Sequence, residues 1–198
     1  KNKFPDKDWS YHDYRNSSIQ AYKMALDEIV NRGGFAIQMG GGSDETLEHQ
    51  YDKKIIDCPN DLNAPFLDIF LPSNCKFFMV GGGSGIGSIA HLFDVPVAWS
   101  NSIPLYSPGL KKSDLVILKL IWDTYAKRYL TFTEMTELGL FYPDIRGDTS
   151  LFYSDKSLRL DENSPDDILD LCIEMFQKIA GESRSNDEKE LQIEFDRR

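Results

Sequence analysis

Apolar positions along the chain alternate between helical spacing and short continuous runs, and this pattern predicts the order of the elements. Ser17 to Arg32 repeats apolar residues every three to four positions, with Ser17 and Gln20 as a capping box. Gly33-Gly34 ends this helix. The apolar run Phe35–Met39 then predicts a buried strand.

The next elements are shorter and more polar. A polar helical turn is predicted over Glu45–Tyr51 and a short strand over Lys54–Asp57. Ala64–Leu71 is predicted as a helix with proline in its first turn, and it is expected to end before Pro72.

A glycine-rich turn lies at the centre of the sequence. The apolar run Phe77–Val80 stops at four small residues, Gly81–Ser84, and apolar residues at helical spacing follow over Gly85–Phe93. A second β-rich run, Val95–Trp99, begins directly afterwards. This strand, turn, helix and strand form the parallel unit in which a helix N-terminus faces out at the carboxyl end of a sheet. It predicts a site for a phosphate, and therefore for a nucleotide or another anion.

The carboxyl-terminal part carries clearer helix signals than strand signals. The apolar run Leu115–Trp122, interrupted by Lys119, predicts one strand. Thr131 with Glu134 is a capping box that opens a short helix closed by Gly139. No regular element is expected from Tyr142 to Leu160.

The last helix has signals at both ends. Ser164 is its expected cap, Pro165 its first residue and Gly181 its end, while Asp166 and Asp167 complement its dipole. We therefore expect one Rossmann-like α/β domain over residues 1–181, a three-layer sandwich with a mainly parallel sheet, and a charged tail over 182–198.

Composition narrows the class of partner. The chain has 198 residues and a net charge of −10, without a basic cluster, which argues against nucleic acid as a partner. No apolar run approaches the roughly 20 residues needed to cross a bilayer, and no signal peptide is seen. Cys58, Cys75 and Cys172 are far apart and odd in number, which favours buried thiols in a reducing compartment. A cytoplasmic location is the resulting expectation.

Other chemistry is weakly indicated. Gly85, Gly87 and Ala90 fit the G-x-G-x-x-A spacing of short-chain dehydrogenases, but a downstream YxxxK pair is missing and Asn101 stands about where an acidic ribose ligand is expected. The sequence contains no Walker motif and no G-x-S-x-G elbow. His91 is interpreted as a surface or packing residue. An alternative for the turn itself is that its glycines only permit a close helix–sheet approach.

Five blocks of sequence together resemble one known family. They are YRNSSIQAYKMALDEIVNRGGFAIQMG, CKFFMVGGGSGIGSIAHLFDVPVAWSNSIPL, DLVILK, YLTFTEM and ENSPDDILDLCIEMFQKIAG. They resemble the carboxyl-terminal half of putative bacterial glycosyltransferases of surface-polysaccharide loci, which have a two-Rossmann (GT-B-like) architecture. The resemblance runs from about Tyr14 to Gly181.

The resemblance implies an activity and a set of partners. The chain is expected to bind the nucleotide-sugar donor of a glycosyltransferase, without a cofactor or metal, while the glycan acceptor and usually the catalytic base belong to the other half. The chain is interpreted as the donor-binding half, or as a family member without its first domain, with an upstream domain and a separate partner as the alternatives for the remaining half. The catalytic residues are not identified.

The resemblance also suggests site residues. We expect the diphosphate over the N–H groups of the glycine turn, and Lys119 near the phosphates or a sugar carboxylate, or else at a strand end with its ammonium in water. Base, ribose and sugar contacts are expected from Asn101, Glu162 and Asn163, and Arg15, Gln38 and Gly40 are further cleft residues. The expected turn residues are Gly82, Gly83, Ser84, Gly85 and Ile86.

Two positions depart from the family pattern. Gln38 stands where the family has arginine, and Gly82 or Gly83 where the turn often begins with an acidic residue. The alternative is therefore a non-catalytic nucleotide- or anion-binding or scaffolding module of the same fold.

Overall fold

The computed structural model describes residues 10–40, 53–58, 64–82, 84–103, 110–140, 153, 156–182 and 190. Over these residues the chain is an α/β structure with two parallel sheets and one antiparallel sheet. The predicted α/β class with parallel strands is confirmed. The predicted turn at 45–51 and the tail beyond 182 lie outside the described residues, apart from Glu190.

Two sheets contain the parallel strands. Sheet A pairs β1 (Ala36–Gln38) with β2 (Ile55–Asp57). Sheet B has the order β3-β4-β5, formed by Phe78–Gly81, Val97–Ser102 and Leu115–Leu118.

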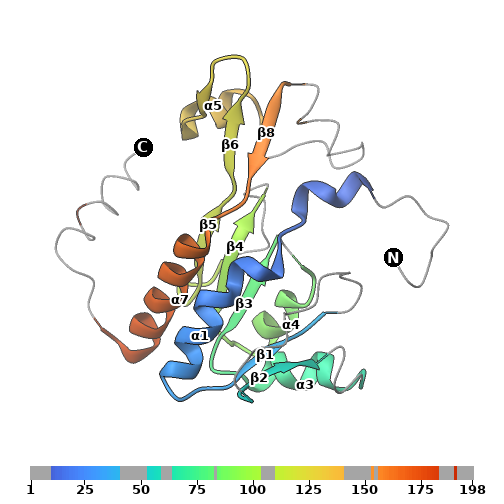
Figure 1. The fold of residues 1–198 in the computed structure, drawn as a ribbon, viewed down its shortest axis with the longest axis vertical. Helices are drawn as coiled ribbons and strands as arrows, with labels where there is room; N and C mark the ends of the chain where they lie inside the picture. The colour runs from blue at the N-terminus through green and yellow to red at the C-terminus, as the bar shows by residue number, and fades with distance from the viewer. Residues whose placement is uncertain are drawn as a thin grey trace.

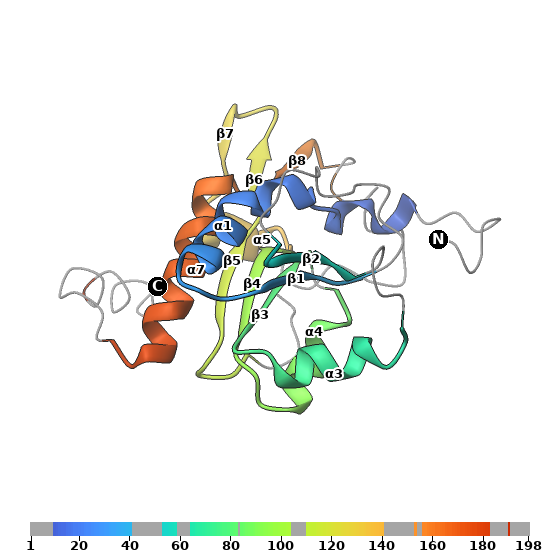
Figure 2. The ribbon, with the colours of Figure 1, turned by 60° about the horizontal axis from the view of Figure 1, so that its bottom comes forward.

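Helices cover both faces of sheet B, which makes three layers. Figures 1 and 2 show α1 (Lys23–Asn31) beside α7 (Pro165–Ala180) on one face, and α3 (Leu67–Asn74) with α4 (Gly87–Leu92) on the other. The reason is apolar burial on each side. Leu171 and Met175 of α7 pack on Ala98 and Leu115, whereas Ala90 of α4 packs on the opposite side of the sheet.

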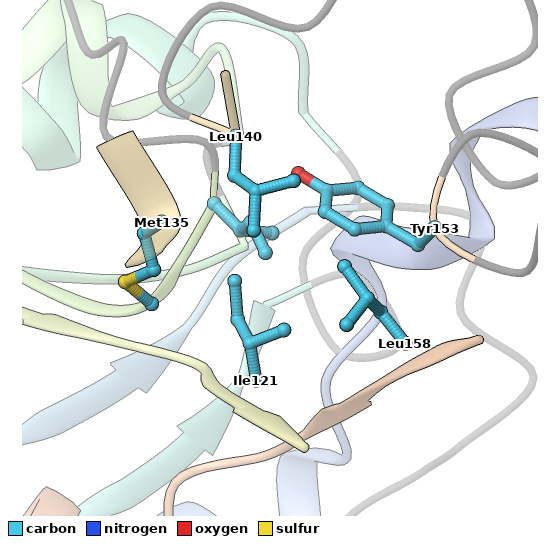
Figure 3. Close-up of a cluster of buried hydrophobic side chains, with 6 residues drawn as sticks. Ile121, Met135, Leu140, Tyr153 and Leu158 are labelled. Carbon is cyan, nitrogen blue, oxygen red and sulfur yellow. The ribbon is translucent and has the colours of Figure 1, made fainter. Parts of the chain in front are cut away.

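An antiparallel sheet extends the molecule at the top of Figure 1. Its order is β7-β6-β8, formed by Arg128–Tyr129, Leu120–Asp123 and Leu158–Asp161. Helix α5 (Phe132–Glu137) packs on it around a second apolar core. Figure 3 shows this core, with the Tyr153 hydroxyl directed toward Leu140.

The amino-terminal region is less regular than predicted. The helix predicted from Ser17 begins at Ile19, and its first turn, η2 (Ile19–Tyr22), is 3₁₀ and runs directly into α1, while η1 (Ser10–Arg15) is a separate 3₁₀ turn. The cap is Ser18, whose hydroxyl accepts from the Gln20 N–H, and not Ser17. The strand predicted over 35–39 is confirmed as β1, but it is not fully buried, because Ile37 within it is 36% exposed and Phe35 just before it is 65% exposed.

Several predicted boundaries are also wrong. The single strand over 115–122 is two strands in different sheets, which meet at Lys119. Helix α3 does not end before Pro72, as predicted, but continues to Asn74. Pro72 has no N–H to donate, and the helix tolerates the loss of this hydrogen bond close to its end. Helix α4 begins at Gly87 and not at Gly85, strand β4 continues to Ser102, and β8 lies in the stretch predicted to be irregular.

Both predicted helix caps near the carboxyl terminus are confirmed. Thr131 and Glu134 form a reciprocal capping box on α5. Ser164 forms one with Asp167 on α7, and Gly181 ends that helix with a φ of 71°.

The capping residue Glu134 provides a prediction about pH. Two hydrogen bonds from the Arg128 guanidinium, at 2.8 and 2.5 Å, and further bonds from Thr131 lower the pKa of this carboxyl from 4.5 to about 2. Because the pKa is lowered on folding, the stabilisation is present above the unfolded pKa and is lost as pH falls toward 2. We expect an NMR titration of Glu134 to show this low pKa, and Arg128→Gln to raise it. A midpoint near 4.5 in the parent protein would contradict the ion pair.

Candidate functional site

A cavity of about 600 Å³ lies between strands β1 and β3. Its walls also include residues of η2, α1 and α3, and Phe176 of α7. This volume is in the range of small-molecule sites. Most of the wall is apolar, and of the residues that line it in the described chain, Lys76 alone is charged.

The strand order explains why a cavity is found here. From β1 the chain moves to β2 on one side, whereas from β3 it moves through β4 to β5. Strands β1 and β3 thus belong to two separate parallel sheets, and the cavity lies between them. Parallel α/β sheets commonly bind ligands at the carboxyl ends of their strands. The residues after both strands line the cavity, Met39 and Gly40 after β1 and Ser84 and Ile86 after β3.

The structure divides the predicted site residues into two groups. Four of them line the cavity: Gln38, Gly40, Ser84 and Ile86. Gly85 lies next to this group, and a side chain added there would meet no atom within 4 Å. Gly83 lies outside the described residues.

The glycines before this open turn contact the protein itself. A Cβ on Gly82 would lie 1.7 Å from the Arg15 carbonyl oxygen, and one on Gly81 would lie 2.5 Å from the Ser17 hydroxyl. Residues 15–22, which we call the amino-terminal strap, are thus seated on the end of β3. Gly81 and Gly82 therefore permit contact with the strap. The alternative in which glycine permits a close helix–sheet approach holds at Gly87, where a Cβ would lie 2.8 Å from the Val80 side chain and 2.9 Å from the Trp99 ring.

Asn101 and Asn163 form a buried pair at the end of β4. The Asn101 N–H donates to the Asn163 Oδ1 at 2.5 Å, the Asn163 N–H donates to the Asn101 Oδ1 at 2.7 Å, and the Asn163 Nδ2 donates to the Leu118 carbonyl. Asn101 has a φ of 51° and lies where β4 shifts register against β5, which is a β-bulge. Asn101 is fully buried and neither asparagine lines the cavity, so this geometry does not bring them to the ligand cavity.

The side chains of Lys119 and Glu162 form hydrogen bonds with the main chain of the amino-terminal strap. Lys119 is 4% exposed, and its ammonium donates to the Asn16 carbonyl at 2.5 Å. Burial lowers the pKa of Lys119, while the Glu162 charge partly opposes this shift. The Glu162 carboxylate accepts the Ser18 N–H at 3.0 Å. The alternative in which Lys119 extends into water is wrong, and neither side chain lines the cavity.

One polar cluster was missed by the sequence analysis. The buried Asp114 carboxylate accepts from the Val97 and Lys111 N–H groups and lies 2.7 Å from the His91 Nε2. The His91 ring packs edge-on against Trp99, with centroids 5.5 Å apart. His91 is thus confirmed as a packing residue, and Asp114 carried no motif by which it was recognised.

The described chain carries little further reactive or metal-binding chemistry outside this cavity and the Asp114 cluster. No group of three or more potential metal ligands is present among the described residues. Within them, no helix is long and apolar enough to span a bilayer. All three cysteines are free thiols, and burial raises the pKa of Cys172 to about 12.

Comparisons of the chain with protein-family models, with curated proteins and with solved structures found no match.

Proposed function

We propose that this chain is the donor-binding domain, Rossmann-like and half of a GT-B-type architecture, of a nucleotide-sugar-dependent glycosyltransferase. The observation that carries the proposal is the apolar cavity between β1 and β3, which is lined by the residues that follow the carboxyl ends of these two strands, Ser84 and Ile86 of the glycine turn among them. The sequence blocks that resemble surface-polysaccharide glycosyltransferases support the same function.

The turn offers donors to a diphosphate. The N–H groups of Gly87, Ser88 and Ile89 donate to the carbonyls of residues 84–86. By contrast, no hydrogen bond within the described chain uses the N–H groups of Ser84, Gly85 or Ile86. Free main-chain donors at a strand–helix turn favour an anion, and they supply this contact without a metal.

One observation favours a second candidate, a binding module without catalysis. Lys119, Glu162 and Asn163 are engaged with the chain itself, so the described cavity has few ionisable groups for acid–base chemistry. In the preferred proposal, the catalytic base that activates the acceptor belongs to a preceding domain. Both candidate functions predict binding of the same ligand, but only the glycosyltransferase would turn that ligand over.

Calorimetric titration tests the ligand. Nucleoside diphosphates and nucleotide sugars are titrated into the parent protein and into Gly85→Val, whose melting temperature is measured in parallel. We expect the valine to reduce diphosphate affinity at least tenfold, since it narrows the turn, and to leave melting nearly unchanged, because nothing lies within 4 Å of its Cβ.

Failure of every nucleotide to bind the folded parent would refute the proposal. Hydrolysis or transfer of a bound sugar by a longer form of the chain would decide between the enzyme and the binding module.

A further inference from the structure

The antiparallel sheet β7-β6-β8 has two faces of different character. Its inner face supplies Ile121 and Leu158 to the second apolar core, on which helix α5 packs. Successive strand residues point to opposite faces, so Leu120, Trp122 and Arg159 lie on the outer face. The outer face of an antiparallel sheet that meets water usually carries polar side chains.

Apolar and aromatic side chains occupy much of this outer face instead. Leu120 is 48% exposed and Tyr129 is 44% exposed. Tyr129 is the cross-strand partner of Trp122, and the centroids of their rings lie 4.9 Å apart with the rings at 78°. Large aromatic side chains gathered on a solvated sheet face indicate a surface that binds a ligand or partner.

An ion pair lies beside these rings. The Arg159 guanidinium carbon is 5.4 Å from the centroid of the Trp122 ring, and the guanidinium donates to both Asp161 oxygens, at 2.6 and 2.8 Å. The Tyr129 hydroxyl donates to the same carboxylate at 3.0 Å. These bonds fix the polar groups around the rings. The Arg159 side chain is still 57% exposed, and only two of its five N–H donors are needed for the bonds to Asp161.

We propose that this outer face binds a neutral oligosaccharide. The face consists of Leu120, Trp122, Tyr129, Arg159 and Asp161. The class of ligand follows from these side chains and does not depend on the proposed donor site. Sheet faces also serve to bind oligosaccharides in OB-folds.

The hydrogen-bonding groups favour a saccharide over a proline-rich peptide. A sugar ring has an apolar face of C–H groups, which can stack on Trp122 or Tyr129, and hydroxyls at its rim that both donate and accept. Such hydroxyls can accept from Arg159 and donate to Asp161. A polyproline segment offers carbonyl acceptors but no N–H donor, so it would cover the Asp161 carboxylate without supplying it a hydrogen bond.

Charge favours a neutral glycan over an anionic ligand. Both arginines in the strands of this sheet are paired with carboxylates, Arg159 with Asp161 and Arg128 with Glu134. The chain as a whole carries a net charge of −10. Such a face does not complement a nucleic acid or an acidic polysaccharide, whereas a neutral saccharide meets no repulsion there.

The position of the face is compatible with a glycan acceptor. Strand β6 follows β5 directly and lies beyond its carboxyl end, as Figure 1 shows. Because β3 and β5 are parallel strands of sheet B, this is also the end at which the glycine turn follows β3. A glycan held on the outer face would therefore lie at the same end of sheet B as the proposed diphosphate.

Titration with defined oligosaccharides tests the proposal. Neutral oligosaccharides of glucose, mannose, galactose and N-acetylglucosamine, an oligogalacturonate and decaproline are each titrated into the parent protein. Binding is followed by NMR on the tryptophan indole signals, and the Trp122 signal is assigned by its absence from Trp122→Phe. We expect at least one neutral oligosaccharide to shift the Trp122 signal. The signal of Trp99, which is buried in sheet B, should stay in place.

Two substitutions of Tyr129 separate stacking from hydrogen bonding. Tyr129→Leu removes the ring, so we expect the affinity for that oligosaccharide to fall about fivefold or more. Tyr129→Phe keeps the ring and loses only the hydroxyl, so we expect a change of about twofold. Phe93→Ala, which removes an exposed aromatic side chain at the end of α4, is the control and should leave the affinity unchanged. The melting temperature of each variant shows whether it is folded.

Several results would overturn the proposal. They are the absence of a Trp122 shift with every neutral oligosaccharide, an affinity that Tyr129→Leu leaves unchanged, and binding of decaproline or the oligogalacturonate alone. A dimer of the chain that sedimentation detects and Tyr129→Leu dissociates would assign the face to a second copy instead. Oligosaccharide binding by a protein that binds no nucleotide would support this inference and refute the proposed donor site, and the converse result would do the opposite.

Discussion

Replacing Gly82 by alanine is expected to destabilise the protein strongly, and far more than the same change at Gly85. The new Cβ would lie 1.7 Å from the Arg15 carbonyl oxygen, and Gly82 has a φ of 62°, which L side chains rarely adopt. Overpacking and left-handed strain together cost about 3 kcal/mol or more. The melting temperature should fall by roughly 10 °C for a chain of this size.

Gly85→Ala is the matched control, since its Cβ meets no atom within 4 Å. Chemical denaturation of both variants gives the two free energies of unfolding. Equal stabilities would show that the strap does not rest on Gly82.

Removing the Asn163 side chain is expected to produce the second large loss. In Asn163→Ala the buried Asn101 N–H loses its acceptor and the Leu118 carbonyl loses its donor. Leaving both groups unpaired costs about 3 kcal/mol in the free energy of unfolding. The bulge in β4, where Asn101 has a positive φ, would lose one of its two main-chain anchors to residue 163.

Asn31→Ala provides the comparison, because Asn31 is exposed at the end of α1. Its unfolding free energy should stay within about 0.5 kcal/mol of the parent value. A similarly small change for Asn163→Ala would mean that the bulge is held by other contacts.

Helix ends that depend on residues close together in the sequence were predicted correctly. The caps at Thr131 and Ser164 and the end at Gly181 depend on residues within a few positions of one another, and all three were predicted. The strand-turn-helix unit around Gly81 was also predicted, although α4 starts two residues later than expected.

Errors occurred where distant parts of the chain decide the structure. The chain changes sheets at Lys119, whose buried ammonium donates to the Asn16 carbonyl, 103 residues away. An apolar run cannot show such a partner. The two roles of the glycines, with Gly82 against the strap and Gly85 open, likewise depend on Arg15 and not on local spacing.

The candidate site shows the same division. Gln38, Gly40, Ser84 and Ile86 were named from sequence and do line one cavity. Asn101, Lys119, Glu162 and Asn163 were predicted to contact the ligand, but none of them lines the cavity. Asn101 and Asn163 are buried and bonded to each other, whereas Lys119 and Glu162 bind the main chain of the strap.

The amino-terminal strap also determines how late in synthesis the carboxyl end of sheet B can finish folding. The Ser18 N–H and the Glu162 carboxylate that accepts its hydrogen bond are 144 residues apart in the chain. The ribosome must therefore synthesise most of the polypeptide before Ser18 can form this hydrogen bond. Contacts of such high sequence separation slow folding, since the entropy of closing the loop is lost before the contact forms. The strap can contact Gly81, Gly82 and Lys119 earlier in synthesis, but its hydrogen bond to Glu162 forms only after residue 162 has emerged.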